Sequence, residues 1–82
     1  MRRVREPIAA QVWFDVDGRP TIRRFRWRGV DYPVTAGGRT WVDEDGLHVL
    51  VMGPDEQIYE LKLDRGDLIW YLERAAARPS AV

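Results

Sequence analysis

The stretch that decides the fold is RRFRWRGVDY, residues 23–32. Its apolar side chains Phe25 and Trp27 alternate with Arg24 and Arg26, and this period of two predicts a β-strand with one apolar face and one arginine face. Arg28-Gly29 follows at the position of a two-residue hairpin turn, where glycine supplies the positive φ that such turns require. The stretch therefore predicts a β-hairpin.

The register of this hairpin follows from the pairs that it creates. A turn at residues 28–29 places apolar opposite apolar and basic opposite acidic side chains, and these pairs stabilise neighbouring strands. The predicted pairs are Trp27 with Val30, Arg26 with Asp31, and Phe25 with Tyr32. A slip of one residue would lose all three. Ile22 is out of phase with Phe25, which predicts a bulge near residues 23–24.

Outside the hairpin, short alternating or apolar segments are separated by turn residues such as Asp17-Gly18. The predicted strands are residues 8–16, 21–27, 30–34, 40–42, 47–52 and 57–63. Asp67 can cap a helix from Leu68 to about Ala77, with Leu68 and Leu72 on its apolar side, and this helix is expected to cover the sheet. The predicted fold is mainly β (α+β): six short antiparallel strands in a small barrel or curled sheet, capped by one C-terminal helix.

The chain of 82 residues is long enough for one domain. We expect a flexible basic arm at residues 1–7, a single domain at 8–78 and a tail at 79–82. Residues 1–39 hold nine arginines and four acids, whereas residues 40–82 hold four basic residues and nine acids. The two halves therefore carry net charges of +5 and −5, which predicts a polarised surface unless the fold interleaves them.

Several classes of protein are disfavoured by composition. There is no cysteine, so disulfides and thiolate-bound metals are excluded. No apolar run approaches the roughly 20 residues of a membrane span, and the basic start lacks the apolar segment of a secretory signal. We therefore expect a cytoplasmic protein that has no membrane contact.

Single aromatic residues at fixed spacing suggest a family. Phe25-x-Trp27-x-Gly29-x-x-Tyr32-x-Val34 is followed by Trp41, by Tyr59-x-Leu61 and by Trp70-x-Leu72. This order resembles a bacterial family of small β-rich domains of unknown function with an F-x-W-R-G-x-x-Y-x-V signature, over residues 6–73. Some relatives are encoded near DNA-repair polymerases, so the resemblance implies a role close to DNA. It implies no catalytic residues.

An enzyme is not expected from these residues. The only serine is Ser80 and the only histidine is His48, which lies in an apolar strand where a packed or hydrogen-bonded role is the more common one. The acidic turn at residues 43–45 lacks the ligand spacing of a calcium loop. We therefore predict no catalytic residue, no metal site and no cofactor.

A binding site is the more open possibility. Side chains two residues apart on a strand project on one face about 6.5–7 Å apart, close to the spacing of phosphates along a nucleic-acid strand. The candidate nucleic-acid-binding residues are Arg23, Arg24, Arg26, Arg28 and the stacking residue Trp13. The alternative is a solvated face, with the arginines paired to Asp15 and Asp31 and lying across Trp13.

Two functions remain open from the sequence. The first is a non-catalytic, nucleic-acid-binding accessory domain that contacts the DNA or RNA backbone through these arginines. The second is a protein-protein interaction or self-associating module, in which the charged halves or the free strand edges meet another chain.

Overall fold

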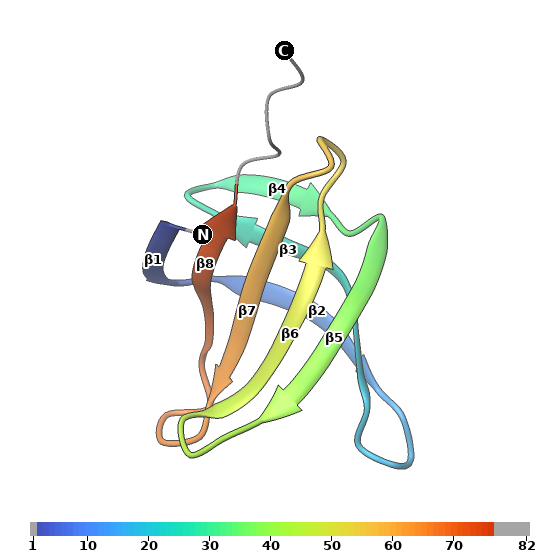
Figure 1. Cartoon of the computed structure of the whole chain (residues 1–82), viewed down its shortest axis with the longest axis vertical. Coiled ribbons are helices and arrows are strands. Elements are labelled where there is room, and N and C mark those ends of the chain that lie inside the picture. Colours follow the sequence, from blue (N-terminus) through green and yellow to red (C-terminus); the bar gives the residue numbers. More distant parts are fainter. Residues whose placement is uncertain (1, 77–82) are drawn as a thin grey trace.

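The hairpin at residues 23–32 lies within a three-stranded sheet that packs against a larger sheet of five strands (Figure 1). The computed structural model describes residues 2–76. The strands are β1 (Arg2–Pro7), β2 (Ala9–Phe14), β3 (Pro20–Trp27), β4 (Val30–Pro33), β5 (Ala36–Val42), β6 (Gly46–Met52), β7 (Ile58–Asp64) and β8 (Trp70–Ala76). One sheet has the order β2-β3-β4 and the other the order β1-β8-β7-β6-β5, and all pairs are antiparallel. The mainly β prediction is confirmed, but the strands form two separate sheets rather than one closed barrel.

The hairpin has the predicted register. Phe25 lies opposite Tyr32, Arg26 opposite Asp31 and Trp27 opposite Val30. Arg28 and Gly29 have φ angles of 51° and 75°, and two positive values in succession match the right-handed twist of the flanking strands. The pairing of β2 with β3 skips Arg23, because Gln11 lies opposite Arg24 and Val12 opposite Ile22. The bulge is therefore where the phase change in the sequence predicts it.

The core lies between the two sheets, whose strands cross at a steep angle (Figure 1). Its fully buried apolar residues are Ile22, Phe25, Val49, Val51, Tyr59, Leu61 and Leu72. Phe25 joins the layers, because its ring stacks on Tyr32 at 5.0 Å and meets the edge of Tyr59 at 5.2 Å. Burial raises the pKa of Tyr59 to about 12. The three-stranded sheet thus covers the face that the predicted helix was expected to cover.

The predicted C-terminal helix is wrong for the residues that the structure describes. Residues 70–76 form β8, and Leu68 has a φ of 60°, which no helix accommodates. Trp70 and Leu72 face the core while Tyr71 and Glu73 face outward, so this segment also alternates with a period of two. β8 pairs on one side with β1 and on the other with β7. These long-range hydrogen bonds override the local helical preference. Residue 77 lies outside the described residues.

The predicted basic arm is also corrected. Arg2–Pro7 form β1, which pairs with β8 and is bent between Arg3 and Glu6, with Arg5 at a φ of 53°. Residues 36–39, which lie outside the predicted strands, form the first half of β5. β1 and β8 raise the number of strands from six to eight, whereas residues 36–39 only lengthen β5. Met1 and the predicted tail at residues 79–82 lie outside the described residues.

Candidate functional site

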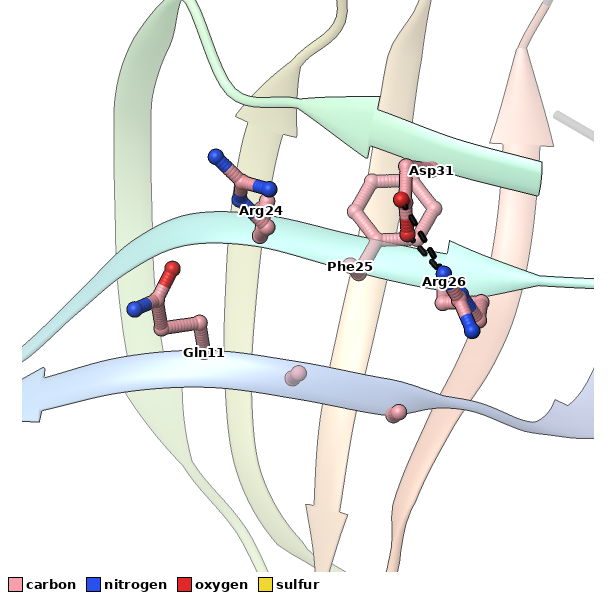
Figure 2. Close-up of a pocket in the computed structure, with 7 residues that line it drawn as sticks. Gln11, Arg24, Phe25, Arg26 and Asp31 are labelled. Atoms are coloured by element: carbon pink, nitrogen blue, oxygen red, sulfur yellow. Dashed lines mark hydrogen bonds and ion pairs between the residues drawn. The ribbon is translucent and has the colours of Figure 1, made fainter. Parts of the chain in front are cut away.

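The outer face of the three-stranded sheet carries most of the predicted site residues. We call this surface the arginine face and define it by Gln11, Trp13, Arg24, Arg26 and Asp31. Gln11 and Arg24 are cross-strand neighbours on β2 and β3, and their side chains project from the same face in Figure 2. An open hollow of about 290 Å³ lies between them, Arg26 and Asp31, above the small side chain of Ala9.

Arg26 is held by a carboxylate. Its Nε donates to Asp31 Oδ1 at 2.9 Å and its Nη2 to Oδ2 at 3.2 Å (Figure 2). This two-point contact lowers the pKa of Asp31 and raises the pKa of Arg26. Both side chains are about half exposed, so the pair contributes little to stability and can exchange partners in water.

Arg24 has a different environment. Within residues 2–76 no carboxylate forms an ion pair with it, and the residue is exposed. Its charge helps to lower the pKa of Asp31 only as a secondary cause, after the contact with Arg26. Arg24 is therefore the cation of the arginine face that is available to a ligand.

Arg28 is not part of this face. Its side chain donates to both carboxylate oxygens of Glu6 on β1, and Trp27 Nε1 donates to the same carboxylate at 2.9 Å. The Arg28 contact is the largest cause that lowers the pKa of Glu6, followed by Trp27. The guanidinium also lies 4.8 Å from the centre of the Trp27 ring. Arg28 thus fastens the β3–β4 turn to β1.

Arg23 is also separated from Arg24. As the bulged residue it is exposed. It lines a second hollow together with Ile22, Val34 and Thr35, beside the connection from β4 to β5. The structure therefore brings Arg24 and Arg26 together on one face, and places Arg23 and Arg28 elsewhere.

Trp13 lies on the arginine face towards the tip of the β2–β3 hairpin and is 61% exposed. The predicted strand at residues 8–16 has apolar residues at its even positions, which predicts one buried face, but Phe14 and Val16 of that face are exposed. β2 ends at Phe14 and Val16 lies in the turn that follows, at the end of a hairpin that extends past the five-stranded sheet (Figure 1). Asp15 was expected to pair with the arginines of this face. It lies at the β2–β3 turn instead, where its backbone N–H donates to the carbonyl oxygen of Arg19.

A second group of polar residues lies on the outer face of the five-stranded sheet. His48, Glu60, Lys62 and Glu73 are each less than 8% exposed. His48 Nδ1 lies 2.9 Å from Glu60 Oε2, and its Nε2 lies 3.0 Å from Asp43 Oδ1. The ring of Trp41 stacks on the imidazole at 4.9 Å. Both nitrogens of His48 are therefore engaged.

The other half of this group is an ion-pair network. Lys62 Nζ lies 3.5 Å from both Asp64 Oδ2 and Glu73 Oε2, and Arg5 Nε donates to Glu73 Oε1 at 3.2 Å. Alternation along β7 predicts that Glu60 and Lys62 face away from the core, and they do. Sequence reasoning missed their burial, because it depends on side chains of the two neighbouring strands. His48 and Arg74 lie beside Glu60, and Tyr71 and Glu73 lie beside Lys62.

Within residues 2–76, no group of His, Asp and Glu side chains is arranged to hold a metal ion. The same part of the chain contains no helix long and apolar enough to cross a membrane. Comparison with protein-family models, curated proteins and solved structures finds no match to this chain. The resemblance to the bacterial family therefore stays a prediction.

Proposed function

We propose that this protein is a non-catalytic module that binds single-stranded nucleic acid through the arginine face. The observation that supports the proposal is the presence of an exposed cation, Arg24, and an exposed aromatic, Trp13, on neighbouring strands of one sheet face, where Arg24 lies opposite Gln11 and Trp13 opposite Thr21. Single-strand binders combine these two groups, because cations follow the phosphates while aromatic rings stack with bases of any sequence.

Each residue of the face has a role in this proposal. Arg24 contacts a phosphate, and Gln11 offers hydrogen bonds to a sugar or base edge beside it. Arg26 contacts the next phosphate after exchanging its exposed pair with Asp31, which costs little. Trp13 stacks on a base at the end of the hollow. The contacts suit DNA or RNA, and a cytoplasmic location agrees with either partner.

The absence of catalysis is part of the proposal. Both ring nitrogens of the single histidine face carboxylates, so neither is available as a general base. The sequence has no cysteine, and its one serine is Ser80. The usual nucleophile-base pairs cannot be assembled from these residues.

The test is fluorescence anisotropy with a labelled oligothymidine of about 20 nucleotides, a length that exceeds the 4–16 nucleotides typical of one small β domain. We expect Trp13→Ala to weaken binding about tenfold, since a base-aromatic stack contributes roughly 1–3 kcal/mol. We expect Arg24→Ala to weaken binding about threefold to tenfold and to reduce the salt slope by about one.

Arg65→Ala is the matched control, because Arg65 is equally exposed and lies on the β7–β8 turn, away from the arginine face. It should leave both affinity and salt slope unchanged. Absence of binding by the wild type at about 50 mM salt, where electrostatic binding is strong, would overturn the proposal. So would an equal loss in the control.

A protein partner is the second candidate function, and one observation favours it. Phe14 is 46% exposed and Val16 fully exposed on the same hairpin as Trp13, so apolar side chains project from both sides of its tip. Nucleic acid would use one of these sides, whereas a cleft in a protein would cover both. Phe14→Ser distinguishes the two, because it should leave oligonucleotide binding intact and remove binding to a protein.

A further inference from the structure

The free edge of β5 differs from the other edges of the two sheets. β1 carries Arg2, Arg3 and Arg5 and ends at Pro7, and β4 has four residues and ends at Pro33. Charges, proline and short length are features by which proteins prevent a further strand from adding. β5 has seven residues with one charge and no proline, it has a strand neighbour on one side only, and its pairing with β6 is irregular between Gly37 and Thr40.

β2 is also an uncharged edge, but β5 has a hollow on each of its two faces. On the outer face lies an apolar hollow of about 160 Å³, lined by Ala36, Gly37, Gly38, Leu50, Met52 and Ile58. Towards the other sheet lies a hollow of about 330 Å³, which contains Arg23 and is lined by Ile22, Val34 and Thr35. Successive side chains of an added strand point to opposite faces, so they would enter these two hollows in turn.

The glycines make this edge accessible. A Cβ at Gly37 would meet no atom within 4 Å, whereas one at Gly38 would lie 3.2 Å from the carbonyl oxygen of Leu50. Gly38 is therefore required for close packing on β6, but Gly37 leaves open space beside the edge. A large side chain from a neighbouring strand can cover a glycine in this position.

We propose that two copies of this chain pair through β5, antiparallel, about a two-fold axis near Arg39. Antiparallel pairing places the end of one β5 beside the start of the other. Residues 40–42 of each copy then lie beside residues 36–38 of the other, next to the apolar hollow. The two strands form one continuous ten-stranded sheet, and the contact is self-complementary as a two-fold interface requires.

Charge supports a second copy as the occupant. Asp43, Glu44 and Asp45 directly follow β5, and in the antiparallel arrangement they lie beside residues 34 and 35 of the second copy, where Arg23 lines the hollow. Two-fold symmetry makes this acidic-to-basic contact twice. Arg39 lies over its own Trp41 ring at 5.1 Å, so each of the two arginines near the axis has a partner within its own chain.

The first experiment is sedimentation equilibrium of the whole chain from about 10 μM to about 1 mM, the range in which a single strand-strand contact of micromolar to millimolar Kd is visible. We expect a monomer-dimer equilibrium. Val42→Lys, at an exposed position of β5, should weaken the dimer at least about tenfold, because a lysine on an edge strand opposes pairing. Val30→Lys on the β4 edge is the matched control and should leave the dimer unchanged.

The second experiment is a charge exchange. Arg23→Glu should weaken the dimer, and adding Glu44→Arg should restore it, because the acidic-to-basic contact is then reversed but kept. Circular dichroism checks that each variant is folded. A wild type that is monomeric over the whole concentration range overturns the proposal. The β5 edge would then bind a different protein or no protein. Equal weakening by Val30→Lys, or no restoration by the exchange, also overturns it. Neither result depends on nucleic-acid binding.

Discussion

The outer faces of the two sheets use the same kinds of residue in opposite ways. On the outer face of the three-stranded sheet, Arg24 and Trp13 are exposed, and the ion pair of Arg26 with Asp31 is half solvated. On the five-stranded sheet, His48 and Glu60 are buried and hydrogen-bonded to each other. An aromatic residue is present on both faces, but Trp41 is stacked on His48 whereas Trp13 is open to solvent.

The comparison distinguishes charged groups that are paired within the fold from charged groups that a ligand could contact. A charged group whose hydrogen-bonding capacity is satisfied inside the chain has little left to offer a ligand. The charges of the five-stranded face are paired within the chain, although Glu73 Oε2 is buried without a hydrogen-bond partner, whereas Arg24 on the three-stranded face is exposed and forms no ion pair within residues 2–76. Residue type alone does not distinguish the two faces, but burial and the number of partners do.

The largest expected effect comes from breaking the buried pair. Glu60→Ala removes the carboxylate that bonds His48 and lies 3.9 Å from Arg74, which leaves a buried ring nitrogen without its partner. We expect the free energy of unfolding to fall by about 3 kcal/mol, as is usual when one member of a buried pair is lost. Urea denaturation measures it. Asp31→Ala, at the exposed pair, should change the unfolding midpoint much less, and equal losses would contradict the comparison.

The two tryptophans give the next largest effect. Trp41→Ala removes the ring stacked on His48 and should destabilise the fold by about 2 kcal/mol. Trp13→Ala should cost less than about 0.5 kcal/mol, because the side chain is mostly exposed. Thermal unfolding followed by circular dichroism compares the variants. A large loss of stability in Trp13→Ala would mean that this residue belongs to the core.

Low pH should reduce the free energy of unfolding through the carboxyl group of Asp43, which bonds His48 on the five-stranded sheet. Its hydrogen bond to His48 is the largest cause that lowers the pKa of this carboxyl below its ordinary value of 3.8. A lowered folded-state pKa stabilises the fold above the unfolded pKa, and this stabilisation is lost as the pH falls through the folded value. Unfolding measured from pH 6 down to about pH 2 should therefore show a decline below about pH 4. The decline should be shallower in Asp43→Asn, and an unchanged slope would exclude this contribution.

The smallest expected effect concerns the exposed pair. Asp31→Asn removes the carboxylate that holds Arg26, and so adds a second available cation to the arginine face. We expect oligonucleotide binding to become about threefold tighter at low salt, because one more phosphate contact forms without competition. Anisotropy titration detects such a change. Weaker binding would show that Asp31 positions Arg26 for the ligand.

Local patterns predicted the hairpin well because its determinants are close in the sequence. Alternation at Phe25 and Trp27, the turn at Gly29 and the opposed charges of Arg26 and Asp31 act within ten residues, and they agree with one another. The segment at Trp70 to Ala76 lacks such determinants. Its sequence is compatible both with an alternating strand and with an amphipathic helix. Only the pairing of this segment with β1 and β7 makes it a strand.

The candidate site was predictable in part. The period of two places Arg24 and Arg26 on one face, but it does not show that Asp31 occupies Arg26 or that Glu6, 22 residues away, binds Arg28. The exposure of Phe14 depends on how far the hairpin extends past the second sheet. These properties arise from the packing of separate elements, which no local window of sequence contains.

The pairing of β1 with β8 also constrains how the chain folds. Arg2 lies opposite Ala75, so the first described strand finds its partner only after more than 70 residues of chain are available. Contacts at such sequence separation are slow to form, because the ends of a long loop must meet before any hydrogen bond is gained. During synthesis, the β3–β4 hairpin can form early, but the five-stranded sheet is completed last. Until then the emerging chain exposes the apolar residues of β6 and β7, and exposed apolar strands favour aggregation during this interval.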